Sequence, residues 1–473
     1  MTDMTTDSAP AGAGSAATDS SASFYRAAWR WHFYAGLYVA PFLIMLAVTG
    51  LIMLWTAVLD GRDGEYRFTV TPGASLAPVS AQVEAASAAN GGATIRHYIA
   101  PRSAEGTALV RVDGEKGPTV VAVNPYTAEV LESWPRRAGL YDLSSDIHGT
   151  LLIGDLGDRL IEIAASFGIV LIITGLYMWW PREEGLARVL LPDLRAAGRK
   201  LMKSLHVSIG FYISLVLVVF LLSGLSWAGI WGDKYVQAWS TFPAEKWDNV
   251  PLSDVTHASM NHGGNDVSWG LQKTPMPASG SDVGVTGVPA GAKVDADSIA
   301  ALARAIGMEG RFQMAFPKGE GGVWSLSQDS MSNDTGNPAD DRTVHVDQYT
   351  GKIIAVAAYA DYSLPAKAMA IGIALHEGDM GWWNVAFNTV FCLAVIFMSV
   401  SGIVMWWMRR PKGAALRLLP PQVPADMPQW RSAMLVMLLV AFAFPLAGLT
   451  MIAVLAIDLL LVSRLPALRR ALR

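Results

Sequence analysis

The chain of 473 residues has a single cysteine, Cys392, which lies within an apolar run. One thiol excludes an internal disulfide, a cluster held by several thiolates and a structural zinc site of the usual kind. Charged residues are also few, at 16% of the chain with a net charge of -4. This balance indicates neither a nucleic-acid-binding surface nor an acidic tail, so we expect no nucleic-acid partner.

Motifs of several enzyme classes are missing as well. The chain has no GxSxG, no GxxxxGKS/T and no strand-flanked GxGxxG motif, which disfavours a hydrolase, an ATPase and direct oxidation of NADPH. The stretch HEGDMGW is not the zinc-protease motif HExxH, because Met380 stands where the second histidine would be. Residues 1–23 lack the basic start and the apolar stretch of a secretion signal, and we predict a disordered cytoplasmic tail there.

Hydrophobic residues, by contrast, make up 52% of the chain, which also has 17 tryptophans and a mean hydropathy of +0.32. These values are typical of a membrane protein in contact with lipid. Four segments are long and apolar enough to cross about 30 Å of hydrocarbon, and we place them in residues 24–59, 148–181, 206–231 and 376–408. A fifth apolar stretch, 432–463, is broken by FPLAGL, so we expect one kinked helix or a hairpin of two short helices.

Basic residues indicate the orientation of these segments. Arginine and lysine are concentrated in residues 182–205, 409–431 and 464–473, which we place in the cytoplasm. We therefore predict a multi-pass protein of the bacterial inner membrane, with residues 60–147 and 232–375 in the periplasm. Both outer segments alternate apolar and polar residues around turns, as in NPYTAEV and DQYTGKI, and each predicts a small α+β domain.

The two halves of the chain repeat each other. HFYAGL at His32 matches HVSIGF at His206, and segments that begin at His148 and His376 both run to two tryptophans and an arginine. The sequence therefore predicts a tandem duplication of one unit, which consists of a membrane helix, an outer domain and a second membrane helix.

The duplication places four histidines at membrane boundaries. If the two units pack about a pseudo-two-fold axis, His32 lies near His206 at the inner face, and His148 lies near His376 at the outer face. Paired imidazoles on facing helices commonly hold a haem iron on both axial sides, and nearby glycines let a flat macrocycle come close. Two haems in a membrane about 30 Å thick would form an electron path. The alternative is that these histidines only anchor the helix ends.

The stretches HFYAGL, HVSIGFY, ITGLYMWWPR, YTGKI and LHEGDMG together resemble the PepSY-associated transmembrane proteins, often described as iron-regulated membrane proteins. The resemblance covers nearly the whole chain from about Arg26 onward. It implies periplasmic PepSY domains, and its best-understood members are inner-membrane reductases of ferric siderophores that carry haem b. Transferred to this chain, the haem ligands of the family are His32, His148, His206 and His376. The chain departs from the family at Ala128, which replaces the glycine of the usual TG turn.

The resemblance and the histidine pattern together predict a haem b protein, with two bis-histidine haems, that reduces a periplasmic ferric siderophore or chelate. Electrons would come from a quinol or a cytoplasmic donor, near basic residues such as Arg26, Arg30, Lys200 and Lys203. One alternative is a non-enzymatic regulator or assembly protein. Another is a copper- or iron-binding transport accessory that uses His257, Met260 and His262, with Met276 and Met331 as further ligands. We expect His97 and His345 to lie on the surface.

Overall fold

The computed structural model describes residues 13–115, 117–181, 190–411, 418, 420–421, 431–462 and 464–465. In this part of the chain, five helices are long and apolar enough to cross a membrane: Ser23–Gly64, Asp155–Trp179, Gly198–Leu225, Trp382–Arg409 and Pro445–Val462. The chain forms two compact units. One comprises residues 1–47, 156–221 and 393–473, and the other comprises 48–155 and 222–392.

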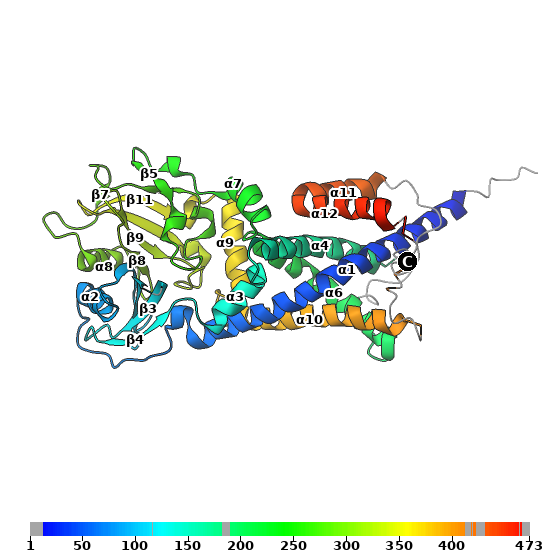
Figure 1. Cartoon of the computed structure of the whole chain (residues 1–473), viewed down its shortest axis with the longest axis horizontal. Coiled ribbons are helices and arrows are strands. Elements are labelled where there is room, and N and C mark those ends of the chain that lie inside the picture. The colour runs from blue at the N-terminus through cyan, green and yellow to red at the C-terminus, as the bar shows by residue number, and fades with distance from the viewer. Residues whose placement is uncertain are drawn as a thin grey trace, which may run out of the picture. The chain divides into compact units, whose positions relative to one another are not determined.

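The first unit is made of apolar helices. Its elements come from α1 (Ala13–Asp60), α4 (Asp155–Trp179), α6 (Gly198–Leu225), α10 (Trp382–Arg409), α11 (Arg431–Ala443) and α12 (Pro445–Ile457), as Figure 1 shows. Helix α1 begins at Ala13, earlier than the predicted end of the disordered tail, and residues 1–12 of that tail lie outside the described residues. Exposed leucine, isoleucine and valine side chains on these helices form the surface that contacts lipid.

The C-terminal apolar stretch is interrupted at Phe444. Helix α11 ends at Ala443 and α12 begins with Pro445, which has no backbone N–H and suits the first turn of a helix. The stretch therefore consists of two helices of 13 residues each, and a π-helical segment, Asp458–Val462, continues the second. Of the predicted basic tail at 464–473, only residues 464 and 465 belong to the described part of the chain.

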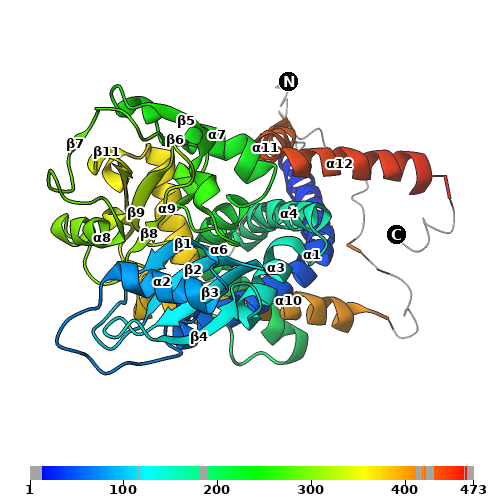
Figure 2. The ribbon, with the colours of Figure 1, turned by 60° about the vertical axis from the view of Figure 1, so that its left-hand side comes forward.

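The second unit is built on a single antiparallel sheet. Its strand order is β4-β3-β2-β1-β8-β9-β10-β11-β7. In Figure 2 the strands of the first outer segment lie beside those of the second. The bounds are β1 (Thr94–Ile99), β2 (Ala108–Gly114), β3 (Gly117–Val123), β4 (Val130–Pro135), β7 (Val285–Thr286), β8 (Gln313–Ala315), β9 (Val323–Gln328), β10 (Arg342–Asp347) and β11 (Lys352–Ala358).

The two outer segments meet where β1 pairs with β8, in the register His97 with Ala315 and Ile99 with Gln313. The sequence predicts two separate domains, but in the structure the segments share one sheet because β8 pairs with the free edge of β1. A bilayer cannot pass through a hydrogen-bonded sheet, so residues 94–135 and 313–358 lie on the same side of any membrane. Helices α4 and α6 separate these segments in the chain, so either both helices cross the membrane or neither does.

One face of the sheet is apolar and is covered by α2 (Val79–Ala89) and α8 (Ala296–Ala305). Side chains alternate between the two faces of a strand, and Tyr98, Met314 and Val344 point to this apolar side. The hydrophobic core of the unit lies here, with Val83 of α2 and Ile299 of α8 against the strands.

The middle of the opposite face carries polar residues, and these are buried. They are His97, Arg111, Gln313, Ser325, Thr343 and His345. The segment 241–272 packs over this face and contributes Trp247 and Leu271 to an apolar cluster with Ala355 and Ala357. The prediction that His97 and His345 lie on the surface is therefore wrong, because alternation gives the face of a strand but does not reveal what covers that face.

The two YT turns cap hairpins of this sheet. The carboxylate of Asp347 accepts hydrogen bonds from the backbone N–H groups of Tyr349 and Thr350, and Gly351 has a φ of +67°. In the first turn Ala128 has a φ of +57°, so the replaced glycine position keeps the same left-handed conformation.

Candidate functional site: two histidine pairs

The inner pair of histidines is held by hydroxyl groups on neighbouring helices. His32 Nδ1 lies 3.0 Å from Thr174 Oγ1, and His206 Nδ1 lies 2.8 Å from Ser401 Oγ. His32 and His206 are close enough that a charge on His206 would act on His32. The first unit thus brings together the two histidines that the sequence pairs at the inner face.

The hydroxyl groups also set the tautomer of both rings. Thr174 donates its hydroxyl to the carbonyl of Val170 at 2.7 Å, and Ser401 donates to Met398 at 3.1 Å. Each oxygen therefore accepts from its histidine, so Nδ1 carries the hydrogen. A neutral imidazole with Nδ1–H has its lone pair on Nε2, which is the state required of a metal ligand.

The outer pair lies in the second unit, and each of its histidines also contacts a hydroxyl group. His148 of α3 (Leu140–Thr150) lies 2.9 Å from Thr49 Oγ1, and His376 of α9 (Leu364–Glu377) lies 2.9 Å from Ser223 Oγ. Both histidines sit on helices that precede the apolar spans, not on the spans themselves. Their ring centroids are 6.3 Å apart, and the ring planes make an angle of 79°.

This separation fits a metal ion between the rings. A metal–imidazole nitrogen distance of about 2 Å, plus about 1.1 Å from that nitrogen to the ring centre, places two collinear rings about 6.2 Å apart. An edge-to-face contact of two rings falls in the same range. The distance therefore accommodates a haem iron between His148 and His376 without requiring one.

A glycine follows each of the four hydroxyl residues. A Cβ atom at Gly175 would lie 3.3 Å from His32 Cε1, and one at Gly224 would lie 3.4 Å from His376 Cε1. The corresponding distance is 3.7 Å for both Gly50 with His148 and Gly402 with His206. Each ring therefore rests against the backbone of a neighbouring helix, where a larger residue would compete for its space.

The four hydroxyl residues are the part of the site that we did not predict. Their signal is a Ser/Thr-Gly dipeptide in each main span, in the sequences VTGL, ITGL, LSGL and VSGI, which contain Thr49, Thr174, Ser223 and Ser401. The pattern is visible once each dipeptide is compared with the histidine it faces. Taken alone, a small residue pair in a membrane helix indicates only close helix packing.

His376 is held by its backbone as well as by its ring. Asn388 Nδ2 donates to the carbonyl of His376 at 3.0 Å and to that of Leu375 at 2.8 Å. Gly378, with a φ of +92°, ends α9 in the left-handed conformation, and a Cβ there would lie 2.4 Å from Leu54 Cδ1. The end of α9 is thus fixed by α10 and by α1.

Arg62, directly after α1, links the two helices that carry the outer pair. It donates to Tyr141 of α3 at 3.0 Å, to Glu377 at 2.7 Å and to Asp379 at 3.0 Å. Burial raises the pKa of Asp379 to about 6, although Arg62 opposes that shift. Arg62 therefore ties α3 and the end of α9 to the turn that follows α1.

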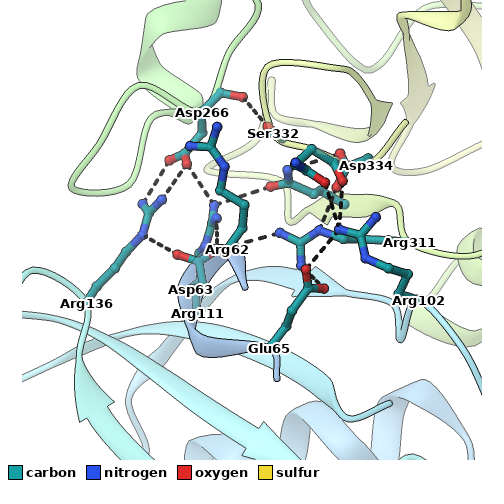
Figure 3. A network of polar contacts seen from close by, with 12 residues as sticks. Arg62, Asp63, Glu65, Arg102, Arg111, Arg136, Asp266, Arg311, Ser332 and Asp334 are labelled. Carbon is teal, nitrogen blue, oxygen red and sulfur yellow. Dashed lines mark hydrogen bonds and ion pairs between the residues drawn. The ribbon is translucent and has the colours of Figure 1, made fainter. Parts of the chain in front are cut away.

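The same turn joins the sheet through a buried network of charges (Figure 3). Asp63 pairs with Arg111 and Arg136, and Glu65 pairs with Arg102 and Arg311. Arg311 and Asp334 come from the second outer segment, and Arg102 and Arg111 come from the first. The network thus crosslinks both halves of the sheet and the turn at 61–65.

The structure does not assemble the predicted metal set of His257, Met260 and His262. His257 Nε2 lies 2.9 Å from His345 Nε2, whereas His262 Nε2 lies 2.7 Å from Asp113 Oδ1. Met276 and Met331 belong to different apolar clusters. Among the described residues, no group of three or more His, Cys, Asp or Glu side chains converges as a metal site.

His257 and His345 instead form a buried chain of hydrogen bonds. His257 Nδ1–H donates to the Thr274 carbonyl at 2.7 Å, so its Nε2 accepts from His345 Nε2–H. Ser325 in turn donates to His345 Nδ1 at 2.9 Å. All three bonds are satisfied when both rings are neutral.

We expect this pair to make the second unit less stable in acid. Burial lowers the pKa of His257 from 6.5 to about 4 and lowers that of His345 well below 6.5. Between these values the unfolded chain binds protons that the folded chain does not, so stability is full above pH 6.5 and falls as the pH drops towards 4. The loss from His257 alone is about 2 kcal/mol at pH 5 and reaches about 3 kcal/mol near pH 4.

Denaturant unfolding of the detergent-solubilised protein at pH 7.5 and pH 5, followed by tryptophan fluorescence, measures this loss. The His257→Gln/His345→Gln variant is the control, since it removes the two groups while other titrating residues remain. Equal pH dependence in the variant and the wild type would contradict the assignment.

Comparison with protein families identifies the family of the chain. The family model described as the PepSY-associated TM region matches residues 29–409. This range includes all four histidines of the two pairs and ends at the last residue of α10. No curated protein matches the chain.

Proposed function

The chain belongs to the PepSY-associated TM family, and from that premise we propose that it is a haem b-containing reductase of the bacterial inner membrane. It passes electrons across the membrane to a ferric siderophore or another ferric chelate in the periplasm, and so supports iron uptake. The observation that carries the proposal is the repeated arrangement of a histidine, a hydroxyl group and a glycine, which occurs four times in two pairs.

The two histidines of each pair are the residues that would hold a haem iron. A bound haem supplies an iron that accepts and donates one electron at a time. The chain contributes the ligands and their orientation: the hydroxyl groups of Thr174 and Ser401 accept from Nδ1 and direct the Nε2 lone pair away from that bond. The glycines beside the rings let each imidazole lie against the neighbouring helix, which fixes its position.

The direction of electron flow follows from the predicted topology. The His32/His206 pair lies on the side of the basic segments and would receive electrons from a quinol or a cytoplasmic donor. Arg26 and Arg30 lie near this pair in sequence, and Arg30 also donates to the carbonyl of Pro421 at 2.7 Å. The His148/His376 pair lies on the side of the sheet, where the ferric chelate would be reduced.

A reduced-minus-oxidised absorbance spectrum of the purified protein tests the proposal. We expect a sharp α-band and about two haems per chain, of which His206→Ala and His376→Ala each remove about half. Tyr212→Phe on α6 and Leu364→Ala on α9 are matched controls, because both side chains are exposed and lie on the helices that carry the two ligands. Ferric chelate added to the reduced protein should then reoxidise it and release ferrous iron.

A flat spectrum after expression with ample haem would exclude the reductase. The histidines would then act as helix anchors, and capture of a periplasmic protein without a chromophore would indicate the regulator. Haem that stays at the wild-type content in both histidine variants would show that other residues bind it.

A further inference from the structure

The buried polar face of the sheet contains a small cavity in the second unit. Its lining includes His97 from β1, Gln313 from β8 and Ser325 from β9, and the covering segment contributes Met260 and Asp266. The site is separate from the histidine pairs described above. It contains one of the residues predicted to bind metal, Met260, together with a histidine that the sequence placed on the surface.

Two imidazole nitrogens in this region lack a partner. His97 Nδ1 and His262 Nδ1 are both buried without a hydrogen bond, and the two side chains are 6% and 7% exposed. Their ring centroids are 6.0 Å apart. A buried polar atom without a partner costs about 1–3 kcal/mol, so two such atoms on adjacent rings indicate that a bound species satisfies both.

The protonation of His262 is set by a carboxylate. Its Nε2–H donates to Asp113 Oδ1 at 2.7 Å, which leaves the lone pair on Nδ1. A carboxylate on the far nitrogen is the usual support of a metal-binding histidine. The loop is also fixed, because the backbone N–H of His262 donates to the Asp266 carboxylate, and Asn261 Oδ1 accepts from the backbone N–H groups of Asp266 and Val267.

The separation of the two rings suits a metal ion shared by their unpartnered nitrogens. A metal ion about 2 Å from each nitrogen would hold collinear ring centres about 6.2 Å apart, and the observed 6.0 Å fits a slightly bent arrangement that leaves a third position.

The surroundings favour a soft ion of low charge. The side chain of Met260 lines the same cavity as His97, and a thioether selects Cu(I) over harder ions. The nearby charges are paired, since Arg96, Arg111 and Arg136 lie against Asp63, Asp113 and Asp266. Asp329 also lines the cavity, and burial raises its pKa well above the ordinary value. These groups therefore do not offset the charge of a divalent cation.

We propose that His97, His262 and Met260 form a binding site for cuprous ion on the extracytoplasmic sheet. His97 takes the place of His257 in the set predicted from sequence, because His257 is engaged by His345. The site does not depend on the haem proposal, and its test reads copper directly.

Anaerobic titration of the full-length protein with Cu(I), in competition with a chromophoric chelator, tests the site. We expect one tightly bound Cu(I) per chain, and X-ray absorption should show nitrogen and sulfur neighbours. Met260→Leu should weaken binding at least about tenfold and remove the sulfur signal, while Asp113→Asn should weaken it about 10–100-fold. Met331→Leu is the matched control, since that buried methionine packs against Trp269 and Ile373 instead.

Met260→Leu conserves volume, so it tests the site even if His262→Ala fails to fold. Absence of bound Cu(I) in the wild type would overturn the proposal. An ordered water would then be the hydrogen-bond partner of the two nitrogens. Cu(I) held with the same affinity by Met260→Leu and His262→Ala would also overturn it, because the ion would then lie elsewhere. Haem content, measured on the same samples, reports on the reductase proposal separately.

Discussion

Replacing Arg311 with methionine is expected to remove about 3–5 kcal/mol of stability from the second unit. The side chain is 1% exposed, and its guanidinium lies 2.8 Å from Asp334 Oδ1, 3.2 Å from Glu65 Oε2 and 3.8 Å from Asp63 Oδ2. Methionine fills a similar space but leaves the buried Asp334 without its paired arginine, whereas Glu65 keeps Arg102 and Asp63 keeps Arg111. The cost is that of uncompensated charge, not of lost volume.

Unfolding of the detergent-solubilised protein in denaturant, followed by the fluorescence of the sheet tryptophans, measures this change. Arg67→Met is the matched control, because Arg67 pairs with Asp60 at 3.4 Å with both side chains partly exposed. Such a pair contributes about 0–1 kcal/mol. Arg311→Met/Asp334→Leu should recover part of the lost stability, and a single variant as stable as the wild type would contradict the role of the network.

Under the haem proposal, placing leucine at Gly224 is expected to remove the haem of the outer pair and leave that of the inner pair, so that haem content falls by about half. The Cβ of any residue at 224 lies 3.4 Å from His376 Cε1, and the rest of a leucine side chain would need the space of the ring. Gly402→Leu should have the reciprocal effect, because Gly402 faces His206.

Haem quantification of the purified variants checks this result. Gly149→Leu is the control: Gly149 neighbours His148 in α3, but a Cβ there meets open space. Gly224→Ala should retain most of the haem, since a methyl group fits at the observed distance. Full haem content in Gly224→Leu would mean that the ring of His376 does not need its present position.

The sequence predicts the parts of the site that depend on local pattern. Apolar length predicts the spans, and repetition predicts that His32 is near His206 and that His148 is near His376. The ring contacts of the outer pair agree with the second expectation. The residues that hold the rings were missed because a Ser/Thr-Gly dipeptide has no meaning until its partner helix is known.

The sheet shows what local sequence pattern cannot predict. Alternation predicts strands at 109–134 and 342–359, close to the observed β2, β3, β4, β10 and β11. Pairing of β1 with β8 joins residues more than two hundred positions apart, and no local pattern carries that information. The same limit explains the error at His97 and His345, because their cover comes from the segment 241–272, which is distant in sequence from both strands.

The shared sheet also imposes an order on synthesis. When only the first outer segment has been synthesised, the edge of β1 is unpaired, and Arg111 can pair with Asp63 but not with Asp266. Both groups keep this state until α4, α6 and the second outer segment have been synthesised. During translation, the incomplete protein therefore exposes a strand edge and charged side chains that are buried in the finished protein. A chaperone or a quality-control protease would recognise the protein at this stage.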